Sequence, residues 1–247
     1  MSININNKTA LVTGANRGIG KAIVESFLSH GAKKVYLAVR NLESTNALVA
    51  AYGDRVQPVH VDLANAESIK QLAQQANDVE IVVNNAGVLE VANPLSENAE
   101  SALNHELTVN TFGLLRMAQA FTPVLEQHNN SAFVQLNSVA SIKNFADFTT
   151  YSASKAAAYS ITQGLKETLA EKNVQVLSVH PGPIDTDMAT QAGMGDGAES
   201  TNTVSEGIVS ALQSGQFHLF PDNMAQTFEG AYNSYANNII EADLSEG

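Results

Sequence analysis

The stretch K-T-A-L-V-T-G-A-N-R-G-I-G, residues 8 to 20, joins a short apolar run to a turn rich in glycine. The apolar run is typical of a buried strand, and residues 18–29 place apolar side chains at helical spacing. Gly14, Gly18 and Gly20 allow a tight turn and a close approach to a pyrophosphate, which the helix N-terminus favours electrostatically. Their spacing, G-x-x-x-G-x-G, differs from the general dinucleotide fingerprint G-x-G-x-x-G, and a purely structural turn is the alternative. The position after a first buried strand favours the nucleotide site.

The rest of the chain repeats this alternation of strand and helix. Continuous apolar strands separated by helices predict an α/β fold: a doubly wound, Rossmann-like parallel sheet of about seven strands, with helices on both faces. No linker rich in proline or serine interrupts the pattern, so we expect a single domain over residues 1–247. The strands are expected at residues 8–13, 35–40, 56–62, 79–84, 132–137, 174–180 and 217–220, and the helices at 18–29, 42–51, 66–76, 99–125, 151–172 and 203–213.

Charge is distributed unevenly along this acidic chain, which carries a net charge of −12. Residues 1–40 contain six basic residues and one acid, whereas residues 173–247 contain ten acids and no Lys or Arg. Nucleic acid is therefore not an expected partner, because it needs a continuous basic surface, and an anionic small ligand near the N-terminus is more plausible. Solvated charge at both ends is the alternative.

Composition narrows the remaining classes. The absence of cysteine excludes disulfides, thiol nucleophiles and cysteine-based metal sites. The histidines show no metal-binding spacing, so no metal is expected. No apolar run reaches the length of a membrane span and no signal peptide begins the chain, so we expect a cytoplasmic protein without a membrane partner.

The end of the second expected strand bears on the identity of the nucleotide. An NAD site usually has an acidic residue there, bonded to the ribose 2′-hydroxyl, but Val39 holds this place and Arg40 follows. Arg17 lies within the glycine turn. Two guanidinium groups suit a 2′-phosphate, so NADP(H) is predicted in preference to NAD(H), unless Arg40 is merely a solvated strand end.

Tyr151 and Lys155 stand four residues apart in Y-S-A-S-K, and therefore on one face of an expected helix. A nearby ammonium group favours the phenolate, which would make this tyrosine a working general acid or base. Y-x-x-x-K also occurs by accident on helix surfaces, so the pair needs the support of its context.

That context resembles the short-chain dehydrogenase/reductase family, in its compact type of about 250 residues. The matching elements appear in order over about three quarters of the chain. They are T-G-A-N-R-G-I-G at 13–20, Asp62 in V-D-L, N-N-A-G at 84–87, Asn110, Ser138, Tyr151, Lys155 and P-G-P-I-D-T at 181–186.

The resemblance implies a role for each of these residues. Tyr151 exchanges the proton with the carbonyl or alcohol oxygen, Lys155 lowers the tyrosine pKa and bonds the nicotinamide ribose, Ser138 positions the substrate oxygen, and Asn110 holds a water of the proton relay. Ile184 and Thr186 contact the nicotinamide carboxamide. The implied cofactor contacts are Gly14, Asn16, Arg17, Gly18, Ile19, Gly20, Arg40, Asp62, Leu63, Asn85, Ala86, Gly87, Tyr151, Lys155, Pro181, Gly182, Ile184 and Thr186.

These residues together predict an oxidoreductase that transfers hydride between NADP(H) and a neutral ketone or aldehyde, or its alcohol. Two other classes compete with it. A hydrolase triad of Ser138, His180 and an aspartate lacks the G-x-S-x-G elbow. A non-catalytic dinucleotide-binding redox regulator would not need the catalytic residues that are present. Asp62 has a structural alternative to cofactor contact, as the N-cap of the following helix.

Two later segments bear on substrate and assembly. Residues 187–201 contain three glycines and are expected to form a substrate flap, with a disordered surface loop as the alternative. Acids in this region disfavour strongly anionic substrates. Residues 221–247 depart from the family's common ending, and Phe228, Tyr232, Tyr235 and Ile239 fall near helical spacing that would dock on the core or on a partner. A homo-oligomer, dimer or tetramer, is expected from the resemblance.

Overall fold

Seven short strands form one parallel sheet in the computed structural model, which describes residues 2–241. Their order across the sheet is β3-β2-β1-β4-β5-β6-β7. Most strand residues are buried, as expected when helices cover both faces. The strands are β1 (Thr9–Thr13), β2 (Lys34–Val39), β3 (Val56–His60), β4 (Ile81–Asn84), β5 (Ser131–Leu136), β6 (Val174–Val179) and β7 (His218–Leu219).

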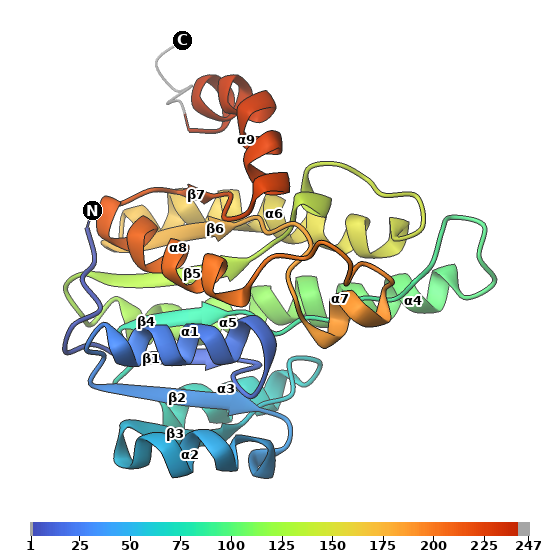
Figure 1. Ribbon diagram of the computed structural model, residues 1–247. Coiled ribbons are helices and arrows are strands. Elements are labelled where there is room, and N and C mark those ends of the chain that lie inside the picture. Colours follow the sequence, from blue (N-terminus) through green and yellow to red (C-terminus); the bar gives the residue numbers. More distant parts are fainter. Residues whose placement is uncertain (1, 242–247) are drawn as a thin grey trace.

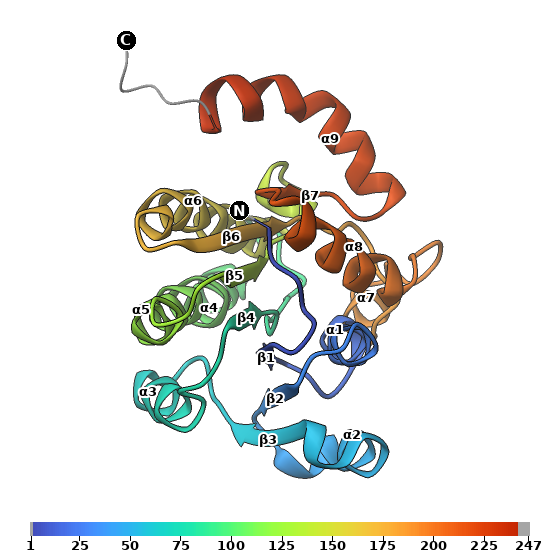
Figure 2. The same cartoon turned by 90° about the vertical axis from the view of Figure 1, so that its left-hand side faces the viewer.

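Helices form a layer on each side of this sheet, which Figure 2 shows nearly end-on. One layer contains α1, α2, α7 and α8, and the other contains α3, α4, α5 and α6. Apolar side chains from each layer pack on the strands as two separate clusters, one containing Phe27 of α1 and the other Phe121 of α5. The helices are α1 (Gly18–Ser29), α2 (Asn46–Tyr52), α3 (Ala66–Gln75), α4 (Ala99–Glu106), α5 (Gly113–Leu125), α6 (Thr149–Ala170), α7 (Asp187–Gln191), α8 (Thr201–Ser214) and α9 (Asn223–Tyr235).

The winding reverses between β1 and β4, the two neighbours at the centre of the sheet. Connections from β1 run outward to β2 and β3, and those from β4 run outward to β5, β6 and β7. In open α/β sheets, ligands bind outside the carboxyl ends of the strands at this switch point. The predicted doubly wound Rossmann-like fold is confirmed, and it places the ligand site at the right-hand edge of the sheet in Figure 1.

The long helix expected at residues 99–125 is not a regular α-helix along its whole length. Residues Leu107–Phe112 form a π-helical segment between α4 and α5, and Asn110 lies within it. Short π-helical insertions are frequent at functional sites because they re-aim a side chain without ending the helix. Helical periodicity in the sequence could not show this local change of winding.

The C-terminal helix α9 extends away from the sheet beside β7 (Figures 1 and 2). Phe228 and Tyr232 pack against a small cluster that contains Val139 and Phe220, as expected for a segment that docks on the core. Tyr235 and Ile239, by contrast, are about half exposed. Phe228 and Tyr232 therefore dock on the core as expected, whereas Tyr235 and Ile239 remain about half exposed. Residues 242–247 lie outside the described residues.

Within residues 2–241, no helix has both the length and the apolar character that crossing a membrane requires. The same part of the chain has no cluster of three or more His, Asp or Glu side chains suited to hold a metal ion.

Candidate active site

A cavity of about 820 Å³ opens at the carboxyl ends of the central strands. Its lining includes residues that are far apart in the sequence, among them the glycine turn, Ser138, Tyr151 and the segment 181–190. Of the predicted site residues, only Gly20 and Asn110 do not line it. Asn110 lies behind the wall and bonds the lining residue Val88, and Gly20 lies against the lining residue Gly14. The structure therefore brings the predicted cofactor and catalytic residues together in one cavity.

The glycine turn supplies one wall of this cavity. Gly18 has φ +52, in the left-handed region that favours glycine, and a Cβ on Gly20 would lie 2.1 Å from the carbonyl oxygen of Gly14. The turn is held against the end of β4 because Nδ2 of Asn85, the residue after that strand, donates to the Thr13 carbonyl at 2.9 Å. Helix α1 begins here with no side-chain cap and no acid in its first turn, so its N–H groups remain available to an anion.

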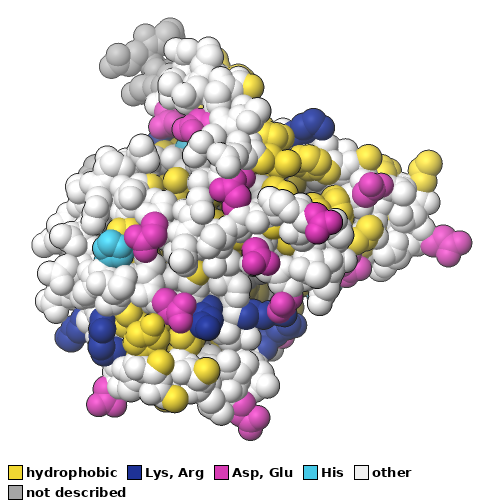
Figure 3. All heavy atoms as spheres, viewed as in Figure 1, with side chains coloured by type: hydrophobic (Ala, Val, Ile, Leu, Met, Phe, Trp, Pro, Cys, Tyr) yellow, Lys and Arg dark blue, Asp and Glu magenta, His cyan; other side chains and the backbone are white. Residues whose placement is uncertain are grey.

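Arg17 and Arg40 both line the part of the cavity next to this turn. Figure 3 shows Lys and Arg side chains mostly in the lower half of the face it presents, around α1 and β2. The Arg17 guanidinium already has a partner, since Nη1 lies 2.7 Å from Asp187 Oδ2 of α7. Arg40 forms no ion pair within residues 2–241. The pairing of Arg17 with the expected flap is a contact that the sequence did not indicate.

Asp62 lies at the carboxyl end of β3 and lines the same cavity. The helix N-cap interpretation of this residue is wrong, because Asn65 caps α3 by accepting the N–H groups of Glu67 and Ser68 at 2.9 and 3.2 Å. Asp62 instead closes a short turn, with Oδ1 accepting the Ala64 N–H at 3.0 Å. A closer and better-placed acceptor in the sequence took the capping role.

Ser138, Tyr151 and Lys155 meet at the inner end of the cavity. Ser138 follows β5, where its Oγ accepts the Ala140 N–H at 3.1 Å and lies 3.3 Å from the Pro181 carbonyl oxygen. Tyr151 and Lys155 come from the first turns of α6, with Lys155 Nζ 5.7 Å from the tyrosine ring centroid. Lys155 Nζ donates to the Leu136 carbonyl at 2.8 Å, which fixes its position under the cavity floor.

The ionisation of this pair differs from the expectation that Lys155 lowers the tyrosine pKa. Burial raises the pKa of Tyr151 to about 12, against the smaller opposing effect of its hydrogen bond with Ser138. Burial also lowers the pKa of Lys155 to about 8. Desolvation disfavours the charged form of both groups and is the largest cause of both shifts. In this structure Tyr151 is therefore a protonated phenol at neutral pH.

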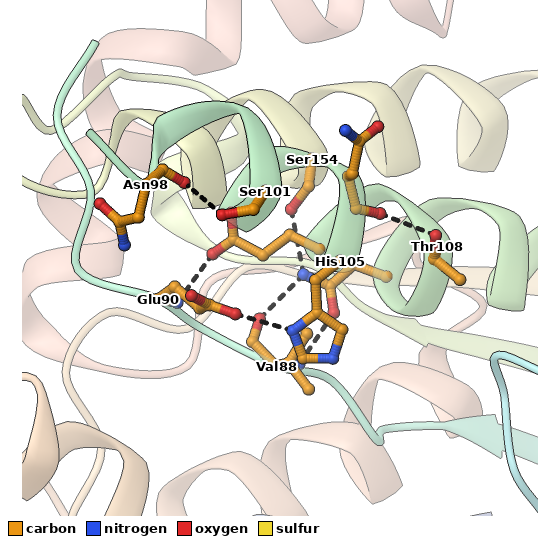
Figure 4. A network of polar contacts seen from close by, with 10 residues as sticks. Val88, Glu90, Asn98, Ser101, His105, Thr108 and Ser154 are labelled. Atoms are coloured by element: carbon orange, nitrogen blue, oxygen red, sulfur yellow. Dashed lines mark hydrogen bonds and ion pairs between the residues drawn. The ribbon is translucent and has the colours of Figure 1, made fainter. Parts of the chain in front are cut away.

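Asn110 lies behind the cavity wall and holds it in place through hydrogen bonds. Its Oδ1 accepts the Val88 N–H at 2.9 Å, while Nδ2 donates to the Val88 carbonyl at 2.9 Å and to Ser154 Oγ at 3.0 Å. These contacts, drawn in Figure 4, connect the loop after β4 with helix α6. A Cβ on Gly87 would lie within 4 Å of both Asn110 Oδ1 and Lys155 Nζ, so glycine keeps the space between them open. The implied relay water stays a prediction.

His180 is the principal polar residue that the sequence left without a role at this site. It is fully buried at the end of β6, where Nδ1 lies 3.0 Å from Ser141 Oγ and Nε2 lies 2.7 Å from Ser178 Oγ. Its contact with Ser138 is to the backbone carbonyl at 3.3 Å and not to the hydroxyl, which argues against a hydrolase triad. The ring stacks on Phe220 with centroids 5.0 Å apart. The imidazole therefore supports the Ser138 loop from below.

This histidine makes protein stability depend on pH. Burial lowers the pKa of His180 to about 3, from about 6.5 in the unfolded chain. Its contribution is fully present above pH 6.5 and is lost as the pH falls toward 3, because the unfolded chain binds the proton more readily. The free energy of unfolding from urea titrations should therefore fall by about 2 kcal/mol from this group alone between pH 7 and pH 5.

A substitution isolates that contribution from those of the carboxylates. In His180→Asn the fall between pH 7 and pH 5 should be smaller than in wild type by about the same 2 kcal/mol. His60→Asn replaces a histidine by the same residue at an exposed position and is the matched control. An identical pH dependence in wild type and His180→Asn would contradict a buried, neutral imidazole.

The outer part of the cavity is lined by apolar side chains that no motif indicated. They come from the loop before α6, from the expected flap and from α9, and they are Phe145, Phe148, Met188, Met194 and Met224. Figure 3 shows hydrophobic side chains gathered on this upper right part of the face, below α9. Apolar residues in loops carry no sequence signal for ligand contact, because their neighbours are set only by the fold. Their presence gives the cavity a polar inner end and an apolar mouth.

Comparison with known proteins agrees with this arrangement. Residues 8–196 match the family model described as short chain dehydrogenase. An uncharacterized oxidoreductase of Staphylococcus aureus (strain USA300) is 33% identical over 187 residues, which covers 74% of this chain and 80% of that protein. A short-chain dehydrogenase from Burkholderia cenocepacia J2315, solved in complex with NADP, superposes with a TM-score of 0.86 at 33% identity and covers 96% of both chains.

A more distant structure shares the fold but holds the other nucleotide. The short chain dehydrogenase/reductase from Burkholderia phymatum, in complex with NAD, has a TM-score of 0.82 at 23% identity and covers 98% of this chain and 99% of its own. The fold alone therefore does not decide between NADP and NAD. The family match spans the glycine turn, Ser138, Tyr151, Lys155 and the segment after β6, which are the residues that meet in the cavity. The chain thus belongs to the short-chain dehydrogenase family of oxidoreductases.

Proposed function

We propose that this oxidoreductase reduces a neutral ketone or aldehyde with NADPH, and oxidises the corresponding alcohol in reverse, with Tyr151 as general acid and base. One observation carries the proposal: Ser138, Tyr151 and Lys155 line the same cavity as the glycine turn. A carbonyl oxygen placed between the Ser138 and Tyr151 hydroxyls would meet two hydrogen-bond donors. Such donors stabilise the negative charge that develops on that oxygen during reduction.

The cofactor fits the residues that are present. Gly20 keeps the turn tight enough for a pyrophosphate to approach the N-terminus of α1, where no side chain caps the backbone N–H groups. Gly14, Asn16, Gly18, Ile19 and Asn85–Gly87 would line the dinucleotide, and Pro181, Gly182, Ile184 and Thr186 would contact its nicotinamide end. Bound NADPH supplies the hydride for the reaction.

The chain's own residues handle the proton. As hydride adds to the carbonyl carbon, the C=O π electrons move to oxygen, and Tyr151 transfers its phenolic proton to that oxygen. Ser138 holds the oxygen in place through a second hydrogen bond. Tyr151 is left as a phenolate, which the neighbouring Lys155 ammonium stabilises until a proton is regained from solvent. Asn110 holds the loop at Val88 that closes this part of the wall.

The preference for NADP(H) rests on Arg40. It follows β2 in the cavity, next to Val39, which holds the place where an NAD-binding protein of this fold usually has an acid, and it has no competing ion-pair partner within residues 2–241. Its guanidinium suits a 2′-phosphate through bidentate hydrogen bonds. Arg17 can contribute once it leaves Asp187, since both side chains of that pair are largely exposed and the contact is weak.

The substrate class follows from the mouth of the cavity. Phe145, Phe148 and Met224 suit an apolar or aromatic group attached to the carbonyl, and acids at 185, 187, 196 and 199 disfavour strongly anionic substrates. Residues 187–201 would close over the substrate as a flap, and their helix α7 places Met188 and Ala189 in the lining. A homo-oligomer stays a prediction.

A panel assay tests the proposal. We expect purified protein to oxidise NADPH in the presence of ketones or aldehydes that carry an apolar or aromatic group, followed by absorbance at 340 nm. Quinones, carboxylated ketones and acyl-carrier thioesters extend the panel and should be poorer substrates. The proposal would be wrong if no carbonyl compound supported turnover, or if acyl-carrier substrates were used more efficiently than simple ketones.

A further inference from the structure

A buried carboxyl group joins the first turn of α9 to the segment after β6. Asp222 is only 2% exposed, and it caps α9 because its Oδ1 accepts the Ala225 N–H at 3.0 Å. Its Oδ2 accepts the Gly182 N–H at 2.7 Å, and Gly182 lines the cavity. Asp222 itself is not among the lining residues. It can therefore act on the site only through the residues that it holds.

The packing around this carboxyl group fixes its place. A Cβ on Gly182 would lie 2.6 Å from Asp222 Oδ1, so glycine allows the segment to approach the carboxyl group this closely. Within residues 2–241 Asp222 has no ion-pair partner, and its carboxyl oxygens are bonded to two backbone N–H groups. A buried carboxyl group depends on such donors, because its burial without them is costly. The positions of Asp222 and Gly182 are therefore fixed together.

The first turn of α9 is itself held in place, so that Asp222 can serve as an anchor. Glu199, at the end of the expected flap, accepts the Asn223 N–H through Oε1 at 2.7 Å. Ala225 is fully buried in the small apolar cluster that contains Val139. The start of α9 is thus bonded to the flap and packed on the loop after β5.

The peptide group between Pro181 and Gly182 is held at both of its ends. Its N–H donates to Asp222, whereas its carbonyl oxygen, which belongs to Pro181, accepts the Val139 N–H at 3.0 Å. The Ser138 hydroxyl donates to the same carbonyl oxygen at 3.3 Å. Because a peptide group is planar, a rotation that breaks the bond at one end also moves the atom at the other. Asp222 therefore fixes the acceptor to which the Ser138 hydroxyl is bonded.

We propose that Asp222 is a positioning residue that acts through Ser138, by fixing the peptide group between Pro181 and Gly182. This inference rests on the proposed function and deepens it, because it extends the site from the lining of the cavity to the start of α9. A bound carbonyl oxygen takes the Ser138 hydrogen bond that the Pro181 carbonyl accepts in this structure. A fixed peptide group keeps the serine oxygen where it can make that exchange, and small displacements of a positioning group lower rates strongly.

Asp222→Ser tests this role while α9 stays capped. Serine is a good N-cap residue, but its single short hydroxyl cannot bond Ala225 and Gly182 together. We expect kcat/KM for carbonyl reduction to fall roughly 10-fold, since the Gly182 N–H is released. Binding of NADPH should change by less than roughly twofold, because Ser138 acts on the substrate. Asp222→Thr keeps the cap and loses the same bond if the serine variant does not fold.

A double-mutant cycle with Ser138→Ala separates positioning from a purely structural role. If Asp222 acts through Ser138, Asp222→Ser should change kcat/KM by less than roughly twofold once the serine hydroxyl is absent. An equal loss in the presence and in the absence of that hydroxyl would overturn the proposal. A loss of NADPH affinity as large as the loss of kcat/KM would overturn it as well.

Glu80→Ser is the matched control for loss of a bond between a carboxyl group and the backbone. Glu80 Oε2 accepts the Thr9 N–H at 3.0 Å at the amino end of β1, the end of the strand opposite to the cavity. This variant should leave kcat/KM for carbonyl reduction unchanged. A fall in Glu80→Ser as large as that in Asp222→Ser would show a general effect of destabilisation and would contradict the proposal.

The hydrogen bond to Gly182 is checked without turnover. In nuclear magnetic resonance spectra, the Gly182 N–H should exchange slowly with solvent deuterium in wild type and faster in Asp222→Ser. Equal exchange rates in the two proteins would contradict the bond on which the proposal depends. Wild-type protein that reduced no carbonyl compound would contradict the proposed function, whereas turnover with an additive cycle would contradict only the role of Asp222.

Discussion

Tyr151→Phe is expected to lower kcat/KM for NADPH-dependent carbonyl reduction by roughly 10²- to 10⁴-fold, the usual contribution of a positioned general acid. Phenylalanine keeps the ring and its packing in the first turn of α6 but lacks the hydroxyl group that we propose as the proton donor. Removing a proton needed in the transition state should reduce kcat and leave binding of NADPH nearly unchanged. The measurement is a steady-state assay at 340 nm, with NADPH binding followed separately by its fluorescence.

Tyr52→Phe is the matched control for this substitution. Tyr52 is the last residue of α2, packs against the core from outside the cavity, and should tolerate the loss of its hydroxyl without loss of activity. Circular dichroism should show the same fold for both variants. A Tyr151→Phe protein that retained more than half of the wild-type kcat/KM would contradict the assignment of the proton donor.

Arg40→Ala is expected to weaken NADPH binding by roughly 10- to 100-fold and to leave NADH binding almost unchanged. The estimate corresponds to about 1.5–3 kcal/mol for hydrogen bonds between a charged donor and a phosphate. Selectivity responds to Arg40 in particular because Arg17 is already paired with Asp187 at 2.7 Å. Fluorescence titration of both nucleotides at constant ionic strength measures the change, since charge interactions at an exposed site depend on salt.

Lys33→Ala provides the control for a general loss of positive charge. Lys33 is exposed and precedes β2, at the end of the strand opposite to Arg40, so it should not affect the affinity for either nucleotide. Equal weakening of NADPH and NADH in Arg40→Ala would contradict recognition of the 2′-phosphate. A wild-type protein that bound NADH more tightly than NADPH would contradict the preference itself.

The sheet and most of the site could be predicted because they depend on local patterns. Apolar runs fix the strands, and parallel pairing brings their carboxyl ends to one edge, so motifs at strand ends had to converge. Gly14, Ser138 and Thr186 therefore meet in one cavity although they are far apart in the chain. Tyr151 and Lys155 share a helix face because residues four positions apart lie one turn apart in a helix.

Other features depend on burial and on contacts between distant side chains, which no local pattern encodes. Tyr151 has a raised pKa because burial disfavours the charged phenolate, and this effect outweighs the opposing effect of its hydrogen bond with Ser138. Asn65 replaces Asp62 as the helix cap because a shift of three residues decides which side chain reaches the free N–H groups. Glu106 looked like an ordinary helix residue, and only the packing of α4 against α6 shows that its carboxyl group is buried.

The most direct test of the central claim is transfer of deuterium from NADPH labelled at C4 to a carbonyl substrate from the panel, with mass spectrometry of the alcohol. If the site holds the nicotinamide in one orientation beside the carbonyl carbon, one of the two C4-labelled isotopomers should yield alcohol heavier by one deuterium, and the other should yield unlabelled alcohol. Alcohol that carried no deuterium from either isotopomer would contradict direct hydride transfer at this site.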